Sequence, residues 1–401
     1  MALMVFGIAL HRNGWRIGYL GASTPAEELE RAAGSASRPN LAVLAATVPK
    51  TLEPLRPQLG SLARRPARPR RSRRHGADRN CGGGPADDRR PGDRGRAGRV
   101  AAVKVLVAGA SGFVGRRLCP ALAKAGHDVV AMTRNPAGYA GAGRPVYGDV
   151  HAPATLGAVM AGCQTAYYLV HSLSDADFER TDAAAAAAFG QAGARAGLQR
   201  IIYLGGLGDD KDALSAHLRS RREVEQLLGS AGVPVTVIRA GIIVGHGGIS
   251  WELTRQLVEH LPAMITPRWV ATRTQPIAVD DVVRYLLGVL TRPEAAGRVF
   301  EAGGPEVLQY VTMLRRVAAI QGRPLPILSV PLLTPRLSSL WLTLVTDVDT
   351  ATGRALIDSM TNEVIVRDHS IRDLIPFDPM PYDDAVRKAL GERVRAKRDG
   401  R

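Results

Sequence analysis

The chain has 401 residues, of which 45% are hydrophobic and 22% are charged. This composition is typical of a globular protein with a sizeable core, and it excludes a collagenous, wholly disordered or disulfide-framework chain. The formal net charge is +16, and much of that excess lies in residues 61–100, which carry 13 Arg and 4 Asp.

The cysteines and the apolar segments predict the cellular compartment of the protein. The three cysteines, Cys81, Cys119 and Cys163, form no CxxC pair and no Cys/His cluster, which predicts neither disulfides nor a metal site and favours a reducing cytoplasm. No stretch approaches the roughly 18 consecutive apolar residues of a membrane span. The apolar start, residues 1–10, has no basic region before it and no cleavage site after it, so we expect a buried helix there rather than a signal peptide.

Residues 1–60 alternate between helix and strand patterns, with IALHRNGWRIGYLGASTPAEEL as their most distinctive phrase. This phrase resembles the second half of the cobalamin-binding domain of light- or cobalamin-responsive MerR-type regulators. In that family a histidine from a preceding element holds cobalt, and a Ser stands in the strand motif. Here no such element precedes the phrase, and the motif carries Ala45 and Ala46. We therefore expect a truncated remnant of this domain that does not bind cobalamin.

Residues 61–101 are too rich in Arg and too poor in apolar side chains to form a core. One interpretation is a nucleic-acid-binding arm, since clustered Arg neutralise phosphates. No aromatic residue lies between the arginines for base stacking, which favours a disordered, solvated linker instead. A third interpretation is that residues 1–100 include coding sequence translated out of frame.

From Val103 the pattern becomes buried strand, glycine turn, amphipathic helix and second buried strand. The turn carries Gly109, Gly112 and Gly115. Glycine is needed there because the chain turns tightly, the backbone approaches a pyrophosphate, and the next helix packs closely on the strand. We expect a dinucleotide phosphate to be held by the backbone amides of Ser111, Gly112, Phe113 and Val114.

The second strand ends before Arg134. An acidic residue at this position would bind the ribose hydroxyls of NAD, whereas a planar guanidinium suits the 2′-phosphate of NADP. The sequence therefore favours NADP(H) over NAD(H). The alternative is that Arg134 is only a solvated residue at a strand end.

Further strands and helices alternate at regular spacing, which predicts an α/β protein with a doubly wound parallel sheet, the Rossmann fold. We expect strands at 145–148, 165–170, 200–205 and 234–241, and helices at 154–161, 177–197, 215–232 and 251–261. Ligands of such folds lie at the carboxyl ends of the strands. The predicted rim is Gly109–Gly115, Arg134, Asp149, Val170–Ser172, Gly205–Gly208 and Gly241–Gly247.

Several phrases on these elements carry a family resemblance: VLVAGASGFVG, VYGDV, AYYLVHS, RIIYLGGLG, LSAHLRSRREVEQLL and VTVIRAGIIVG. With them, residues 103–390 resemble the atypical short-chain dehydrogenase/reductase superfamily, close to its NmrA-like NAD(P)H-binding branch. The resemblance implies cofactor contacts at Asp149 and Val150 beside the adenine, and at Leu169, Val170 and His171 beside the nicotinamide ribose.

Catalytic members of that superfamily use a Ser near the end of the fifth strand and a Tyr-x-x-x-Lys on the next helix. In this chain Gly205 and Gly206, which we assign to the cofactor rim, replace the Ser, and His217 and Arg221 stand where Tyr and Lys would lie. Residues four apart share a helix face, so His217 is a candidate proton donor with a cation beside it. His171 is a second candidate donor. The alternative is that these side chains only contact cofactor or solvent.

Beyond residue 303 the pattern loosens to a helix at 307–321, a Pro-punctuated apolar stretch at 324–345 and a final helix at 382–390. The resemblance implies that this region covers the substrate side of the nicotinamide. The apolar residues around Trp341 could line a substrate pocket, dock a partner or membrane surface, or pack in the core.

The predicted organisation is a remnant domain at 1–60, a linker at 61–101, a Rossmann domain at 102–303 and a smaller C-terminal α/β substrate-side region at 304–401. The predicted function is reduction of a small apolar carbonyl, enone or quinone by NADPH, with the substrate and the oligomeric state left open. One alternative is an NADP(H)-binding redox sensor or assembly protein without turnover. A second alternative is a fragment of a cobalamin-linked regulator.

Overall fold

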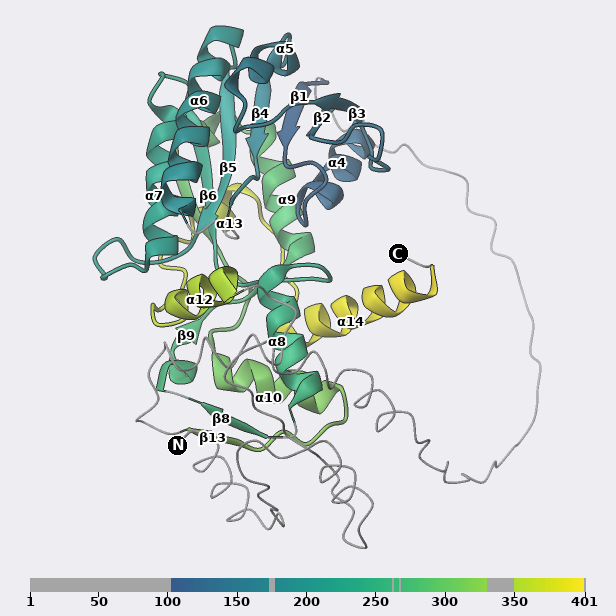
Figure 1. Cartoon of the computed structure of the whole chain (residues 1–401), viewed down its shortest axis with the longest axis vertical. Coiled ribbons are helices and arrows are strands. Elements are labelled where there is room, and N and C mark those ends of the chain that lie inside the picture. The colour runs from purple at the N-terminus through teal and green to yellow at the C-terminus, as the bar shows by residue number, and fades with distance from the viewer. Residues whose placement is uncertain (1–101, 173–176, 262, 267, 330–349, 400–401) are drawn as a thin grey trace, which may run out of the picture. The chain divides into compact units, whose positions relative to one another are not determined.

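The computed structural model describes residues 102–172, 177–261, 263–266, 268–329 and 350–399 (Figure 1). The predicted cobalamin-domain remnant, the Arg-rich linker and the Trp341 cluster all lie outside these residues. No helix within the described ranges is long and apolar enough to cross a membrane.

Seven parallel strands form the central sheet, in the order β11-β6-β5-β4-β1-β2-β3. The strands are β1 (Lys104–Ala108), β2 (Asp128–Thr133), β3 (Arg144–Tyr147), β4 (Thr165–Tyr168), β5 (Arg200–Gly206), β6 (Val235–Ala240) and β11 (Val299–Ala302). The order reverses at β1, which pairs with β2 on one side and β4 on the other. In open parallel sheets such a reversal marks the crevice in which ligands bind.

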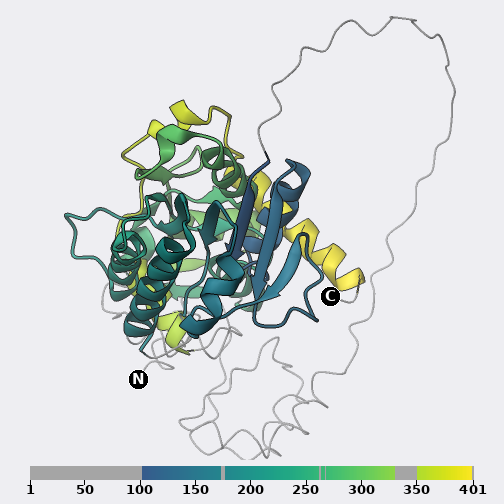
Figure 2. The same cartoon turned by 90° about the horizontal axis from the view of Figure 1, so that it is seen from above.

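Helices cover both faces of this sheet, as the view from above shows (Figure 2). One face carries α5 (Leu156–Met160), α6 (Phe178–Ala196) and α7 (Ala216–Gly229). The other face carries α4 (Gly115–Lys124), α9 (Val279–Leu290) and α13 (Ser370–Leu374). The predicted doubly wound Rossmann fold is confirmed.

The core follows from the alternation of side chains along each strand. In β1, Val105 and Val107 pack in the cluster with α4 and α9, whereas Leu106 and Ala108 pack in the cluster with α5 and α6. All four side chains are completely buried. A strand buried on both faces needs a continuous apolar run, which is what this strand carries.

A smaller region follows the carboxyl ends of β6 and β11 and has its own apolar cluster, centred on Trp251, Val317 and Val386. Its helices are α8 (Ile249–His260), α10 (Tyr310–Ile320), α12 (Thr350–Ser359) and α14 (Tyr382–Arg398). Its short strands pair as β7 (Ile243–Val244) with β10 (Ile277–Ala278), β9 (Arg273–Thr274) with β12 (Leu308–Gln309), and β8 (Met264–Thr266) with β13 (Ile327–Ser329). Short 3-10 turns occur at η3 (Pro153–Thr155), η4 (Arg268–Ala271) and η5 (Pro293–Ala295).

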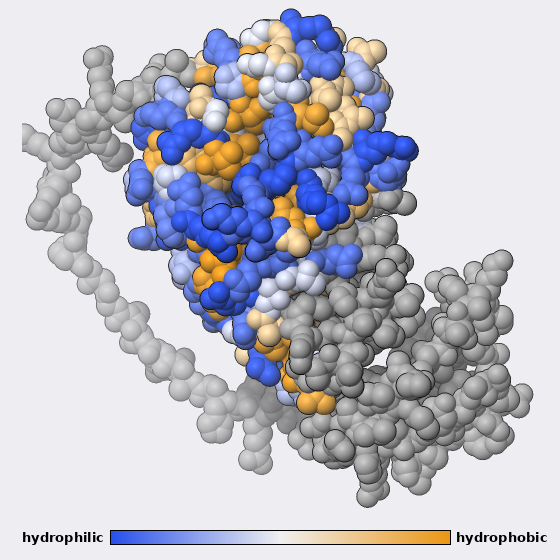
Figure 3. Space-filling model, turned by 90° about the vertical axis from the view of Figure 1, so that its left-hand side faces the viewer, coloured by the Kyte–Doolittle hydropathy of each residue, from blue (hydrophilic) through white to orange (hydrophobic). Residues whose placement is uncertain are grey.

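The surface on the α6 and α7 side is mostly hydrophilic, with scattered apolar patches (Figure 3). This pattern is expected of helices that bury one face against a sheet and expose the other. In α7, for example, Leu218, Val224 and Leu228 are buried, whereas Arg219 and Glu223 are exposed.

Candidate functional site

The turn between β1 and α4 has the compact shape expected of a phosphate loop. Gly109 has a φ of +87°, a left-handed conformation that favours glycine. A Cβ built on Gly115 would lie 2.1 Å from the Gly109 carbonyl oxygen, and one built on Gly109 would lie 2.9 Å from the carbonyl oxygen of Leu169. Both glycines are therefore required by close backbone approach.

The amides of this loop are only partly available to a ligand. The Gly112 N–H donates to the Gly109 carbonyl at 3.0 Å, so it serves to close the turn. The N–H groups of Ser111, Phe113 and Val114 make no backbone hydrogen bond to another described residue. They lie at the N-terminal end of α4, where the helix dipole favours an anion. The residues present therefore fit a dinucleotide phosphate.

The loop is supported from behind by the segment that follows β7. Arg116 and Arg117 both donate to the His246 carbonyl oxygen, at 2.7 and 3.0 Å. Arg117 also pairs with Glu392 of α14 at 2.6 Å. These contacts fix the first turn of α4 to the smaller C-terminal region.

The predicted cofactor residues at neighbouring strand ends differ in availability. Arg134 is exposed after β2 and has no ion pair or hydrogen bond to another described residue. The Asp149 carboxylate accepts the His151 N–H at 3.0 Å. Val150 is 3% exposed and packs in the core, so only its backbone could reach an adenine. Leu169 and Val170 are half-buried after β4, and His171 is exposed.

Gly205 and Gly206 stand where the superfamily has its Ser, and the structure gives a packing reason for both. A Cβ on Gly205 would lie 2.8 Å from a carboxylate oxygen of Glu225 in α7. A Cβ on Gly206 would lie 2.9 Å from Leu218 and 3.5 Å from Cγ of Arg221. Glycine at both positions lets α7 and its charged side chains lie close to the end of β5.

His217 and Arg221 are in direct contact, as their spacing on one helix face predicts. The Arg221 Nε–H donates to His217 Nε2 at 3.3 Å, so this nitrogen acts as an acceptor. His217 Nδ1, 3.1 Å from the Ser359 Oγ of α12, then carries the proton and donates it. Both ring nitrogens of His217 are thus used inside the protein.

The charge of Arg221 acts on several neighbours. Burial lowers the pKa of His217 well below 6.5, and the charge of Arg221 lowers it further. The pKa of His171 is lowered as well, by desolvation first and by the charge of Arg221 second. Both histidines are therefore neutral at neutral pH.

Two further buried groups lie near Arg221, and sequence reasoning missed the first of them. Asp182 of α6 is 3% exposed, and burial raises its pKa while Arg221 opposes that rise. Burial also raises the pKa of Tyr203 in β5, again opposed by Arg221. The Tyr203 hydroxyl has no hydrogen bond of acceptable geometry. The available signal for Asp182 was a lone carboxylate beside an alanine-rich helix face, TDAAAAAAF.

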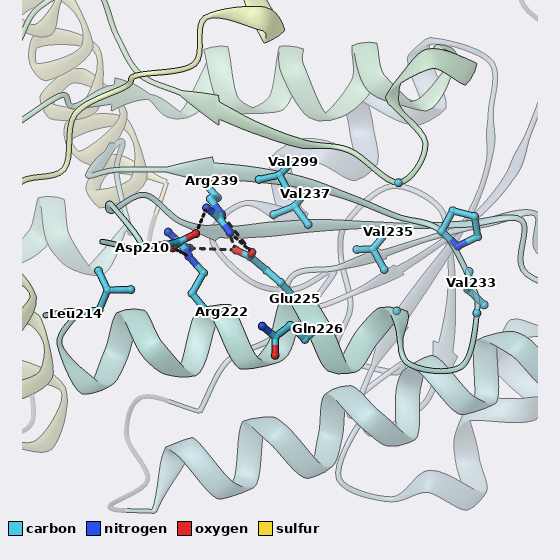
Figure 4. A pocket seen from close by; sticks show the side chains of 14 residues that line it. Asp210, Leu214, Arg222, Glu225, Gln226, Val233, Val235, Val237, Arg239 and Val299 are labelled. Atoms are coloured by element: carbon cyan, nitrogen blue, oxygen red, sulfur yellow. Dashed lines mark hydrogen bonds and ion pairs between the residues drawn. The ribbon is translucent and has the colours of Figure 1, made fainter. Parts of the chain in front are cut away.

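A second charged cluster lies between α7 and β6, beside a groove of about 770 Å³ (Figure 4). Arg222 and Arg239 each pair with both Asp210 and Glu225, at distances from 2.5 to 3.1 Å. Val235, Val237 and Val299 form the apolar part of the groove. Every charge in this cluster has an opposite charge next to it.

Comparison with known proteins agrees with this geometry. Residues 109–292 match a family described as NAD(P)H-binding. The chain is 28% identical over 236 residues to a (4-alkanoyl-5-oxo-2,5-dihydrofuran-3-yl)methyl phosphate reductase of Streptomyces griseus, a match that covers 55% of this chain and 75% of the relative. Three mycobacterial proteins of unassigned function match over only 25% of their length.

Two solved structures show the same fold. The triphenylmethane reductase of Citrobacter sp. in complex with NADP(H) has a TM-score of 0.60 and 15% identity, covering 71% of this chain and 100% of that one. An NADPH-dependent quinone oxidoreductase of Escherichia coli in complex with NADPH has a TM-score of 0.59 and 18% identity, covering 71% and 98%.

The Gly115 contact predicts the effect of one methyl group. Gly115→Ala should weaken NADPH binding by at least tenfold, because the new Cβ would displace the Gly109 carbonyl from the loop. Gly157→Ala in α5 is the matched control, since no atom lies within 4 Å of its built Cβ. Calorimetric titration of NADPH, with melting curves of both variants, measures the effect. Equal affinities for NADPH in the two variants would contradict the proposed loop geometry.

The lowered pKa of His217 predicts an acid-sensitive fold. As pH falls below about 6.5, the unfolded chain protonates this histidine while the folded protein does not, which costs up to about 1.4 kcal/mol per pH unit. The free energy of unfolding should therefore fall between about pH 7.5 and 5.5, with a shallower slope in His217→Gln. Urea denaturation at each pH gives these slopes, and an unchanged slope in the variant would show that His217 titrates normally.

Proposed function

We propose that the protein is an NADPH-dependent oxidoreductase acting on a small carbonyl, enone or quinone, because residues 109–292 match an NAD(P)H-binding family. The observation that carries the proposal is the phosphate loop at the sheet reversal, where Gly109 and Gly115 leave room that a Cβ would fill. The relatives named as reductases and the NADPH-bound structures support the same class of reaction.

Preference for NADP(H) rests on Arg134. Its guanidinium is exposed at the carboxyl end of β2 and makes no ion pair with another described residue, so it is free to bind a 2′-phosphate. Charge-assisted contacts of this kind contribute about 1.5–3 kcal/mol, enough for tenfold discrimination or more. Asp149, Leu169 and Val170 complete the proposed cofactor rim.

In the proposed reaction, the phosphate loop and Arg134 would hold NADPH, which would supply the hydride that reduces a carbonyl and would leave as NADP⁺. The protein would have to supply or relay the proton that the carbonyl oxygen takes up to form the alcohol. His171 is the better placed of the two predicted proton donors, because both nitrogens of His217 are used by Arg221 and Ser359. A neutral imidazole can still polarise a carbonyl by donating its N–H. His217 then acts by holding Arg221 in place.

One observation favours the alternative of an NADP(H)-binding sensor without turnover. The ring that stands in place of the superfamily's tyrosine is His217, and it offers no free N–H to a substrate. In either case, the two buried free thiols, Cys119 and Cys163, suit a reducing cytoplasm. The preference for an apolar substrate concerns residues 324–345, most of which lie outside the described ranges, and stays a prediction.

The cofactor preference predicts a selective loss. Arg134→Gln should weaken NADPH binding by at least tenfold and leave NADH binding unchanged, because only NADPH carries the 2′-phosphate. Arg144→Gln, an exposed arginine at the opposite end of the neighbouring strand β3, is the control and should change neither. Calorimetric titration of both nucleotides into the full chain measures this. Equal loss of NADPH and NADH affinity in Arg134→Gln would contradict the proposal that Arg134 binds the 2′-phosphate.

A turnover assay distinguishes the oxidoreductase proposal from the alternative of a sensor without turnover. With NADPH deuterated at C4 and a panel of carbonyls, enones and quinones, we expect deuterium in the reduced product. His171→Ala should lower kcat by about 100-fold or more, as expected for loss of a proton donor. NADPH binding without deuterium transfer to any compound in the panel would favour the sensor.

A further inference from the structure

Arg221 is a cation in a confined position. It lies on α7, is only 7% exposed, and passes over Gly206 at the carboxyl end of β5. Its Nε–H is used by His217. The Tyr203 hydroxyl is a further hydrogen-bonding neighbour of the guanidinium, although its geometry is imperfect. Among the described residues, no carboxylate lies within 4 Å of Arg221.

Three other arginines of low exposure among the described residues are neutralised by carboxylates. Arg222 and Arg239, with side chains 12% and 13% exposed, share Asp210 and Glu225. Arg255, at 7%, pairs with Glu252 and Glu259. Arg222 is the next residue along the same helix. The chain thus supplies carboxylates to comparably buried guanidinium groups and leaves Arg221 without one among the described residues.

Among the described residues, no group around Arg221 forms an ion pair with it. His217 is neutral and held by Ser359, and His171 is neutral as well. The Tyr203 hydroxyl carries no charge. Asp182 feels the charge of Arg221, but it is not within ion-pair distance, and burial raises its pKa. A buried charge without a partner is costly, which makes an exogenous anion a favourable partner here.

We propose that Arg221 binds an anionic group of the substrate, which is a carboxylate or a phosphate ester. This proposal rests on the proposed oxidoreductase function. The planar guanidinium forms two parallel hydrogen bonds to either group. Its position beside His171, next to the residues predicted to line the nicotinamide ribose, places this anion on the reacting side of the site. The substrate is then an anionic carbonyl compound rather than a wholly apolar one.

The test uses benzoate and benzamide, which have the same size but differ in charge, and inorganic phosphate. Each is titrated calorimetrically into the NADP⁺-loaded full chain at constant ionic strength. Benzoate and phosphate should bind the wild type, benzamide should bind at least tenfold more weakly than benzoate, and Arg221→Gln should lose at least tenfold in benzoate affinity. Arg219→Gln, which removes an exposed arginine from the same helix, should behave as the wild type.

Arg221→Lys keeps the charge but lacks the planar fork, and it covers the case in which Arg221→Gln does not fold. The Arg221→Lys variant should bind benzoate more weakly than the wild type does. It should still bind benzoate more tightly than it binds benzamide. Benzoate binding that is equal in wild type and Arg221→Gln, or no tighter than that of benzamide, would overturn the proposal. So would a tenfold loss of NADPH affinity in Arg221→Gln without an effect on benzoate, which would assign Arg221 to the cofactor.

Failure of this proposal can be distinguished from failure of the proposed function. If the wild type binds neither NADPH nor NADP⁺, the oxidoreductase proposal fails, and the same titrations are made on the nucleotide-free chain. Arg221-dependent benzoate binding would then keep the anion site, and its absence would remove it.

Discussion

A parallel sheet that is buried on both faces constrains everything else in this protein. Val105, Leu106 and their neighbours leave no polar surface on either side of the sheet, because helices cover both faces. Charged and hydrogen-bonding groups can then meet a ligand only where the strands end. The phosphate loop, Arg134, Asp149 and His171 all follow strand ends for this reason.

The same constraint explains how much the sequence could predict. Apolar runs and glycine spacing defined the first six strands of the sheet and the phosphate loop, because these patterns are local. The seventh strand, β11, and the two- or three-residue strands of the smaller region carry too little periodicity to be recognised. The predicted contact of His217 with Arg221 was also local, since both lie on one helix face.

What sequence reasoning could not give was the environment of those side chains. Ser359, the hydrogen-bond partner of His217 Nδ1, lies 142 residues away along the chain. Gly205 and Gly206 suggested only a missing Ser, whereas Glu225, Leu218 and the stem of Arg221 occupy the space that a side chain would need. Arg222 forms ion pairs with carboxylates, whereas Arg221 forms none among the described residues. This difference between neighbouring residues depends on which carboxylates the fold places beside each guanidinium.

The link between His217 and Ser359 also bears on the order in which the protein is made. The strands and helices of the nucleotide-binding domain leave the ribosome before α12, and domains generally fold as units during synthesis. A nascent chain ending before residue 350 therefore holds all seven strands but still lacks the partner of His217, the helix α13 that covers one face of the sheet, and Glu392 beside the first turn of α4. The last 50 or so residues thus deliver these three supports together, so the sheet can pair its strands before its surroundings are complete.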